Sequence, residues 1–245
     1  MKLLLVNGNT DPAITALILA RAEAALPRLG LPHLRLEAVT APFGARYIAS
    51  RAAVAVASHA VLEALAEHLT PAHDAAIIAC FGEPGLEAAR ELCAVPVRGM
   101  AEASLAVGFR IAPRIALLTG GAAWVPMLEE FCALRGFGRD QVLVRAVAPT
   151  GDMIAREPDR ALALLAEAAR DAAAEGAAAV VLGGAGLAGL AERIAGEVPV
   201  PLLDSLDCAL IEAAAGSATA CPASQAPQAG LSPTLAALFG RMPAT

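Results

Sequence analysis

The sequence predicts an α/β fold of two pseudo-symmetric lobes, each a parallel β-sheet flanked by helices. Three observations predict it. Short apolar runs alternate with helical patterns throughout the 245 residues, several of these runs are continuously apolar, and motifs of the first half recur in the second. Strands that are apolar on both faces are typical of parallel sheets covered by helices on both sides. The length is sufficient for one large domain or two small lobes.

Eight apolar runs carry the strand prediction, and helical stretches follow most of them. They are Lys2–Val6, Leu34–Thr40, Ala75–Ala79, Val95–Arg98, Arg114–Leu118, Val142–Val147, Ala178–Leu182 and Val198–Leu203. Asp11-Pro12 and Ser232-Pro233 each set a capping side chain before a proline, which is typical of a helix start. Gly216–Gly230 is expected to be a loop that leads to a short last helix.

An internal repeat relates the two halves. ACFGEPGL (Ala79–Leu86) aligns with GGAGLAGL (Gly183–Leu190), which sets Cys80 against Gly184, 104 positions later. Val95-Pro96-Val97 meets Val198-Pro199-Val200 at 103 positions, and KLLLVNG from residue 2 meets RIALLTG from residue 114 at 112 positions. We therefore expect one lobe of residues 1–100 plus 205–245 and a second lobe of residues 101–204.

The loops after the predicted strands are the expected binding site, because ligands of parallel sheets bind beyond the carboxyl ends of the strands. Glycine turns that lead into helices present backbone N–H groups to a carboxylate or to an enolate oxygen. The repeat gathers these loops around one cleft between the lobes. The expected substrate contacts there are Asn7, Asn9, Thr10, Phe81, Gly82, Thr119, Gly120, Gly184 and Ala185.

Cys80 is the candidate catalytic residue. It ends a fully apolar strand and precedes a helix, whose N-terminus is expected to lower the pKa of the thiol and favour the thiolate. A thiolate acts as a nucleophile or as a base toward a carbon acid. Glu83 can tune this thiol, or can serve the helix dipole from the first turn. The alternative for Cys80 is a core cysteine at a strand end.

Composition excludes several classes of protein. The formal net charge is −6, aromatic residues make up 3%, and no lysine or arginine cluster occurs, so neither nucleic acid nor an acidic membrane is an expected partner. Five cysteines without a CxxC motif form neither a disulfide framework nor a metal site. The apolar run after Met1 is too short for a signal peptide, so we expect a cytoplasmic protein. The four histidines are expected at the surface: His33, His59, His68 and His73.

Five stretches resemble the hydantoin/allantoin racemase branch of the aspartate/glutamate racemase superfamily, over about the first 215 residues. They are NGNT from Asn7, RYIASRAAVAVASHAVLEAL from Arg46, IIACFGEPGLEAAREL from Ile77, PVRGMAEAS from Pro96 and VVLGGAGLAGL from Val180. The resemblance implies a racemase that acts on a carbon acid alpha to a carbonyl, without pyridoxal phosphate, metal or any other cofactor. It implies a small hydantoin-like or amino-acid-like substrate with carboxylate or carbonyl groups, contacted also by Tyr47, and it leaves a homo-oligomer open.

Two departures from the family pattern fall on the second lobe. Family members set two cysteines on opposite faces of the stereocentre, one to remove the α-proton and one to deliver a proton. The first falls on Cys80 and the second on Gly184, and Gly120 stands where the family has a second threonine after Thr119. Glycine has no side chain that transfers a proton, so water would have to serve, or Cys208 on the following helix. A structural cysteine explains Cys208 better.

Three alternatives remain beside the racemase. A decarboxylase of the arylmalonate type needs only one thiol, since loss of CO₂ supplies its own carbanion. A non-catalytic ligand binder also fits the loss at Gly184. A dinucleotide-binding protein is suggested by GAGLAG from Gly184 with Asp204 twenty residues later, but only 41 residues follow Asp204, too few for a second nucleotide-binding half. Asp204 is otherwise expected to cap the final helix.

Overall fold

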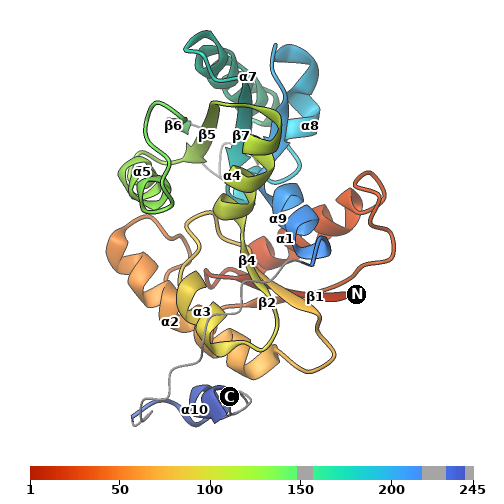
Figure 1. Cartoon of the computed structure of the whole chain (residues 1–245), viewed down its shortest axis with the longest axis vertical. Helices are drawn as coiled ribbons and strands as arrows, with labels where there is room; N and C mark the ends of the chain where they lie inside the picture. The colour runs from red at the N-terminus through yellow and green to blue at the C-terminus, as the bar shows by residue number, and fades with distance from the viewer. Residues whose placement is uncertain (148–156, 217–229, 241–245) are drawn as a thin grey trace. The chain divides into compact units, whose positions relative to one another are not determined.

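The computed structural model describes residues 1–147, 157–216 and 230–240. The chain divides into two compact units, Met1–Gly99 with Ala209–Thr245 and Met100–Cys208. Each unit holds one four-stranded sheet in which every neighbouring pair of strands is parallel (Figure 1). The predicted fold class is confirmed, and a strand forms within or beside each of the eight predicted runs.

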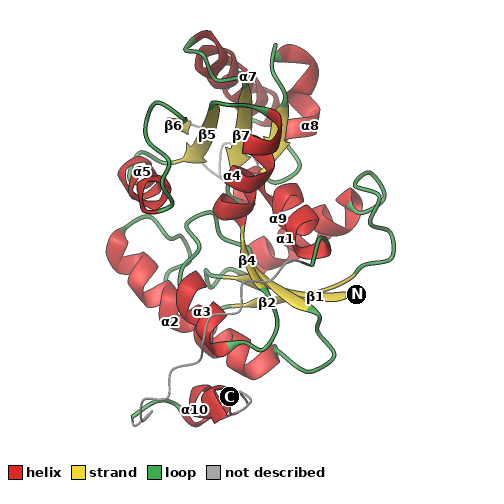
Figure 2. Ribbon diagram, in the orientation of Figure 1, coloured by secondary structure: helices red, strands yellow, loops and turns green. Residues whose placement is uncertain are grey.

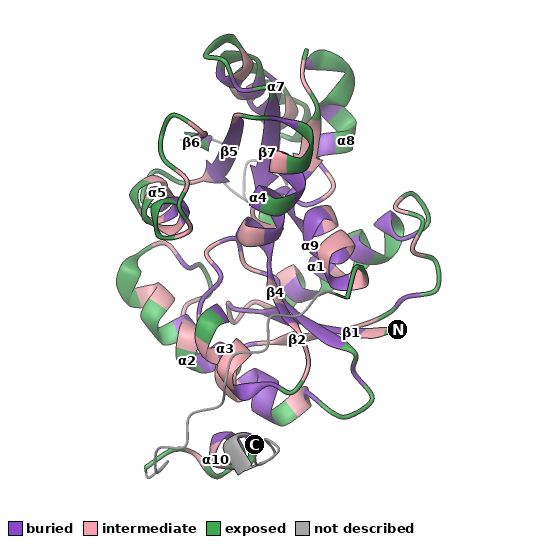
Figure 3. Cartoon of the chain, in the orientation of Figure 1, coloured by how far each residue is buried: buried purple, intermediate pink, exposed green. Residues whose placement is uncertain are grey.

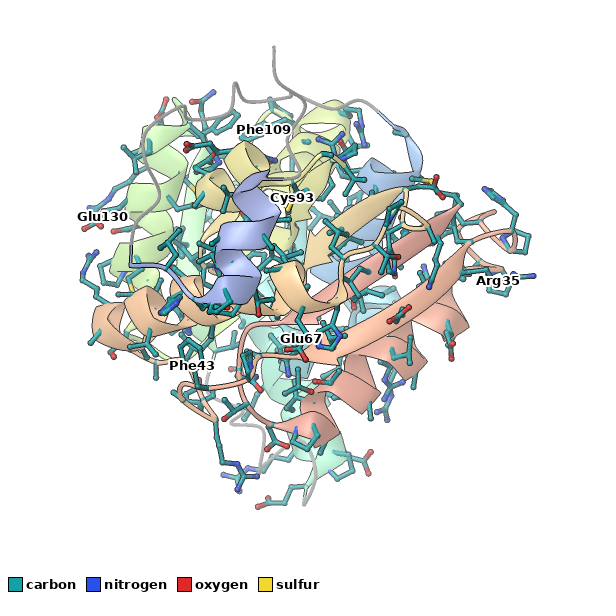
Figure 4. All side chains as sticks on the ribbon, turned by 90° about the horizontal axis from the view of Figure 1, so that it is seen from below. Arg35, Phe43, Glu67, Cys93, Phe109 and Glu130 are labelled. Atoms are coloured by element: carbon teal, nitrogen blue, oxygen red, sulfur yellow. The ribbon has the colours of Figure 1, made fainter. Side chains whose placement is uncertain are left out.

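The first unit has the strand order β2-β1-β3-β4, with β1 (Lys2–Asn7), β2 (Arg35–Thr40), β3 (Ala75–Ile78) and β4 (Val97–Gly99). Leu4 and Val6 of β1 pack with α2 (Arg51–His68), α3 (Leu86–Leu92) and α10 (Pro233–Gly240). Leu235 and Leu238 of α10 belong to the same apolar cluster as Cys93, which is labelled in Figure 4. Helix α1 (Pro12–Ala25) packs against β1 and β2 (Figure 2). Apolar side chains on both faces of β1 therefore explain its continuous apolar run.

The second unit repeats this plan with the order β6-β5-β7-β8. Its strands are β5 (Ile115–Gly120), β6 (Val142–Val147), β7 (Ala179–Gly183) and β8 (Leu202–Asp204). The apolar cluster on one face joins β5 and β7 to α7 (Pro158–Ala174) and α8 (Ala191–Ile194). Helices α4 (Met100–Ile111) and α5 (Trp124–Leu134) also pack against the sheet. Figure 3 shows β5 and β7 as buried strands between these layers.

Backbone pairing confirms most of the internal repeat. Asp74 N donates to Lys2 O at 2.8 Å, and Ala178 N donates to Arg114 O at the same distance in the second unit. Asp74 and Ala178 are 104 positions apart, and Lys2 and Arg114 are 112 apart, as the sequence alignment predicts. The two central strands of each sheet are therefore equivalent residue by residue.

The predicted alignment of the last strands is wrong by two residues. Ala76 N donates to Pro96 O, and Val180 N donates to Pro201 O, both at 2.9 Å. Pro96 is therefore equivalent to Pro201, not to Pro199. Strand β8 starts at Leu202 and not at Val198, because two prolines without N–H groups interrupt the predicted run.

The predicted helix starts are confirmed. The Asp11 carboxylate accepts a hydrogen bond from Ala13 N at 3.0 Å, and α1 begins at Pro12. Ser232 Oγ accepts from Leu235 N at 3.1 Å, and α10 begins at Pro233. Most of the loop predicted at Gly216–Gly230, together with Cys221, lies outside the described residues.

His73 is buried, which contradicts the surface position expected for it. Only 3% of the residue is exposed, because it ends the turn that leads from α2 into the buried strand β3. Its Nδ1 accepts a hydrogen bond from Thr70 N at 3.2 Å, and its Nε2 lies 3.3 Å from Glu37 Oε2. His33 and His59 are exposed, and His68 is half-buried.

Candidate active site

The loop after β1 uses its amide side chains to build itself. Asn7 is 2% exposed, and its Nδ2 donates to Asn9 Oδ1 and to Thr15 Oγ1, each at 3.0 Å. Asn7 Oδ1 accepts from Asn9 N at 3.1 Å, and Asn9 Oδ1 accepts from Asp11 N at 2.9 Å. Thr10 N donates to Ala45 O at 3.2 Å. Asn7 and Asn9 therefore fix the shape of the loop at the carboxyl end of β1.

Two glycines let this loop, the Cys80 turn and helix α2 approach one another. A Cβ on Gly8 would lie 3.2 Å from Pro84 Cγ and 3.6 Å from Cys80 Cβ, closer than most real contacts in the first case. Gly85 has φ +76°, and a Cβ there would lie 2.9 Å from Ser58 O. Glycine avoids both the strained backbone and the collision with α2. The repeat motif thus packs the Cys80 turn against the first loop.

Cys80 is half-buried and lies two residues after the end of β3. Burial raises the pKa of its thiol to about 11, against the opposing effect of a hydrogen bond from the Gly82 backbone, and the Glu83 carboxylate raises it further. The expected thiolate is therefore wrong: desolvation and a neighbouring carboxylate outweigh one N–H group. Helix α3 begins only at Leu86 and has seven residues. Cys80 is a protonated thiol at neutral pH.

The other predicted residues of the first unit occupy different environments. Phe81 is 5% exposed and Gly82 is half-buried. Tyr47 is 65% exposed, and its neighbour Arg46 pairs with Asp11 through an Nη2–Oδ2 distance of 2.8 Å. Glu83 was expected in the first turn of the helix. It lies three residues before α3 begins.

The corresponding edge of the second sheet carries almost no side chains. Thr119 is 3% exposed and pairs in register with Gly183, and Gly120 and Gly184 come directly after this pair. Apart from the glycine itself and its two chain neighbours, no described residue has an atom within 4 Å of a Cβ built on Gly120 or on Gly184. Gly184 has φ +128°, whereas Gly120 has no positive φ. Ala185 begins a single 3₁₀ turn, Ala185–Leu187.

Asp204 and Ser205 hold the loop that follows Gly184. Gly184 N donates to Ser205 Oγ at 3.2 Å, and Gly189 N donates to Asp204 Oδ2 at 2.5 Å. Asp204 Oδ1 accepts from Leu206 N at 2.9 Å, so this residue caps α9 (Ser205–Ala214), not the final helix α10. A carboxylate occupied in this way does not suit the ribose contact of a dinucleotide site.

Cys208 has the features of a core cysteine. It is 1% exposed, and burial raises the pKa of its thiol to about 12, with a hydrogen bond to Ser104 acting in the opposite direction. Among the residues that the structure describes, no three His, Cys, Asp or Glu side chains gather closely enough to hold a metal ion. Within the same residues, no helix has the length and apolar character needed to cross a membrane.

Sequence reasoning missed Gly99 at the end of β4. A Cβ there would overlap the carboxyl group of Glu83, sixteen positions earlier in the chain. Only glycine at position 99 leaves room for this carboxyl group. The register of the last strands makes Gly99 equivalent to Asp204. Each unit therefore places one buried carboxylate at the carboxyl end of its fourth strand. A sequence alignment that set Pro96 against Pro201 would have matched Gly99 with Asp204 and so drawn attention to this position.

The duplicated four-stranded parallel sheets are those of a racemase fold. Residues 3–213 match the family Asp/Glu/Hydantoin racemase, so the chain belongs to this family. A hydantoin racemase from Rhizobium meliloti is 37% identical over 138 residues, which cover 56% of this chain and 57% of that protein. A hydantoin racemase from Paenarthrobacter aurescens is 31% identical over 214 residues, which cover 85% of this chain and 88% of the relative.

Solved structures agree with this assignment. Allantoin racemase from Klebsiella pneumoniae has a TM-score of 0.83 and 28% identity, with 96% of this chain and 98% of that chain covered. Arylmalonate decarboxylase has a TM-score of 0.60 at 19% identity, with 91% and 96% covered, a likeness of fold alone. The resemblance to the hydantoin/allantoin racemase branch is confirmed, and the chain is an enzyme of the racemase superfamily. The equivalence of Gly184 to a family cysteine stays a prediction.

Proposed function

We propose that this enzyme exchanges a proton at a carbon alpha to a carbonyl group of a hydantoin-like substrate, with Cys80 as its thiol acid/base. The observation that carries the proposal is the position of Cys80. In a chain of the racemase family, its half-buried thiol follows a buried strand and lies beside the β1 loop. Similarity to hydantoin and allantoin racemases supports the substrate class.

The protonation state of Cys80 fixes its role at rest. With a thiol pKa of about 11, only about one molecule in ten thousand carries the thiolate at pH 7. At rest, Cys80 is therefore in the protonated form that can donate a proton to a planar enolate. In the reverse direction, a substrate proton passes to the thiolate and regenerates the thiol. Backbone N–H groups of glycine turns stabilise the enolate oxygen.

Water would serve the opposite face in this proposal: it takes the α-proton when the Cys80 thiol donates, and it supplies a proton when the Cys80 thiolate accepts one. The position of Gly184 has no side chain to transfer a proton, and no described atom lies within 4 Å of its absent Cβ. We do not assign this role to Cys208, because its thiol is buried and hydrogen-bonded to Ser104. The interlobe cleft and the substrate contacts of Asn9, Thr10, Tyr47, Phe81, Gly82, Thr119, Gly120 and Ala185 stay predictions. Asn7 would contribute by holding its loop.

A decarboxylase is the second candidate, and the protonated thiol favours it. Loss of CO₂ from a substituted malonate leaves its electron pair on the α-carbon, the Cys80 S–H protonates that carbon, and solvent returns a proton to the thiolate. One donor completes this sequence, so the bare edge at Gly184 is no obstacle. Racemisation keeps priority, because the hydantoin and allantoin racemases are much more similar to this chain than the decarboxylases are.

The remaining proposals concern the setting of the enzyme. Its relatives act on small molecules, and we propose a small substrate with carboxylate or carbonyl groups as its partner, with neither nucleic acid nor a membrane involved. We propose a cytoplasmic location, where a reducing environment keeps cysteine thiols free. Self-association into a homo-oligomer stays open.

A substrate panel tests the proposed function. Single enantiomers of 5-substituted hydantoins and of allantoin, and α-aryl malonates, are incubated with the enzyme in D₂O. Optical rotation, proton NMR at the α-carbon and CO₂ release are followed. We expect loss of the α-proton signal together with loss of rotation for a hydantoin or for allantoin. Release of CO₂ from malonates without exchange on hydantoins would establish the decarboxylase. A folded enzyme inert toward all three would contradict both.

A further inference from the structure

Glu83 has an unusual local structure for a carboxylate. It is the one non-glycine with a positive φ, +47°, among the described residues, and 5% of it is exposed. Its N–H donates to Cys80 O at 2.9 Å, and its carbonyl accepts from Leu86 N at 3.2 Å. A left-handed non-glycine residue is strained, and such strain persists where the surrounding structure requires it. The Cys80 turn is therefore closed by Glu83 at a cost to the backbone.

The Glu83 side chain is held against the end of the fourth strand. Any side chain at Gly99 would overlap its carboxyl group, so the β4 end leaves a space that this carboxyl group fills. In the second unit the equivalent place is occupied by Asp204, which binds the backbone N–H of Gly189 in the loop after Gly184. Gly189 is the repeat counterpart of Gly85. In both units a buried carboxylate stands beside the turn that leaves the third strand of the sheet.

Other charged side chains lie on the elements packed near this turn. Those of α2, α3 and β4 are Arg51, His59, Glu63, Glu67, His68, Glu87, Arg90, Glu91 and Arg98, and Asp11 and Arg46 lie on the neighbouring loops. Arg46 pairs with Asp11 at 2.8 Å and His59 lies 3.2 Å from Glu63, while Arg90 Nε donates to Val97 O at 3.1 Å. Glu83 is the carboxylate whose charge acts on the Cys80 thiol.

We propose that Glu83 is a positioning residue for Cys80: it closes the Cys80 turn and holds a negative charge at the end of β4, within the reach of this turn, so that the resting thiol stays a proton donor. The proposal rests on the proposed role of Cys80. The negative charge of Glu83 favours one direction of proton transfer, from the Cys80 thiol to the intermediate. A thiolate formed next to Glu83 is destabilised and returns its proton readily to the enolate, which favours protonation of the intermediate.

The test is the pH profile of Cys80 alkylation by iodoacetamide in the full-length protein, followed by mass spectrometry of the Cys80 peptide. This reaction reads the thiolate and requires no turnover. In Glu83→Gln the alkylation rate at pH 8 should rise at least about threefold, and the midpoint of the profile should move to lower pH, because the neighbouring charge is gone. Glu87→Gln is the matched control on an exposed residue of α3 and should keep the wild-type profile.

Glu83→Asp provides a second variant in case the glutamine does not fold. The shorter side chain keeps its charge but moves the carboxylate away from Gly99 and relative to Cys80, so the midpoint of the profile should differ from that of the wild type. A folded Glu83→Gln or Glu83→Asp protein with an unchanged profile, or an equal change in Glu87→Gln, would overturn the proposal. Failure of the proposed function is separate: racemisation that survives in Cys80→Ser would remove the catalytic role of Cys80 and leave the alkylation result intact.

Discussion

Substitution of Gly184 separates backbone strain from proton chemistry. Gly184 has φ +128° with no described atom within 4 Å of a Cβ, so Gly184→Ala adds strain without a collision. A non-glycine residue in such a sparsely populated region costs about 1–3 kcal/mol. For a chain of this length each kcal/mol lowers Tm by roughly 2–4 °C. Gly184→Cys carries the same strain and adds a thiol at the position where the family pattern predicts one.

Urea unfolding and exchange of the α-proton in D₂O measure the two effects. We expect Gly184→Ala and Gly184→Cys to be destabilised alike, and Gly184→Cys to racemise at least about tenfold faster than Gly184→Ala. Gly120→Thr is the control, because it has room and no positive φ, and it should change the unfolding free energy by less than about 0.5 kcal/mol. An unchanged stability of Gly184→Ala would refute the strain argument. Equal rates for the two variants would refute the position assigned to Gly184 in the site.

Two further predictions concern the second unit. Burial raises the pKa of Asp204 from 3.8 to about 6, and the charge of Asp207 adds to the increase. The native state therefore holds this proton more tightly than the unfolded chain does. As a result, the contribution of Asp204 to the free energy of unfolding falls by about 1–3 kcal/mol as pH rises from about 4 to 6. Unfolding of Asp204→Asn should lack this slope, and an identical slope in the variant would contradict the assignment. Cys208→Ala should keep racemase activity within about twofold while losing about 1 kcal/mol of stability, whereas a hundredfold loss of activity would make Cys208 the second acid/base.

Much of the fold could be predicted because its signals are local. Continuous apolar runs identify β1, β3, β5 and β7, and the repeat at 104 and 112 positions follows from similar turns after similar strands. The last strands were misaligned because the Val-Pro-Val motifs match in letters but not in place. A second proline, Pro201, takes the role of Pro96. Sequence similarity over three residues could not reveal this shift.

The properties of the site were harder to predict, because they depend on contacts between distant residues. Cys80 could be singled out by its place after a buried strand, but the desolvation that keeps its thiol protonated comes from the packing around it. The contact between Glu83 and Gly99 joins the Cys80 turn to the end of β4, two segments with no local pattern in common. Asn7 was predicted to bind a ligand, and its amide is used within its own loop. His73 is buried because the sheet begins immediately after it.

The central claim, that Cys80 transfers the proton, is tested most directly by deuterium exchange at the α-carbon in a Cys80→Ser variant. The control is Cys93→Ser, which alters a buried cysteine at the end of α3. With a hydantoin that the wild-type enzyme racemises, Cys80→Ser should exchange at least about a hundredfold more slowly, the usual minimum for a positioned acid/base. Cys93→Ser, once its fold is verified, should stay within about twofold of the wild type. Exchange by folded Cys80→Ser at the wild-type rate would contradict the account.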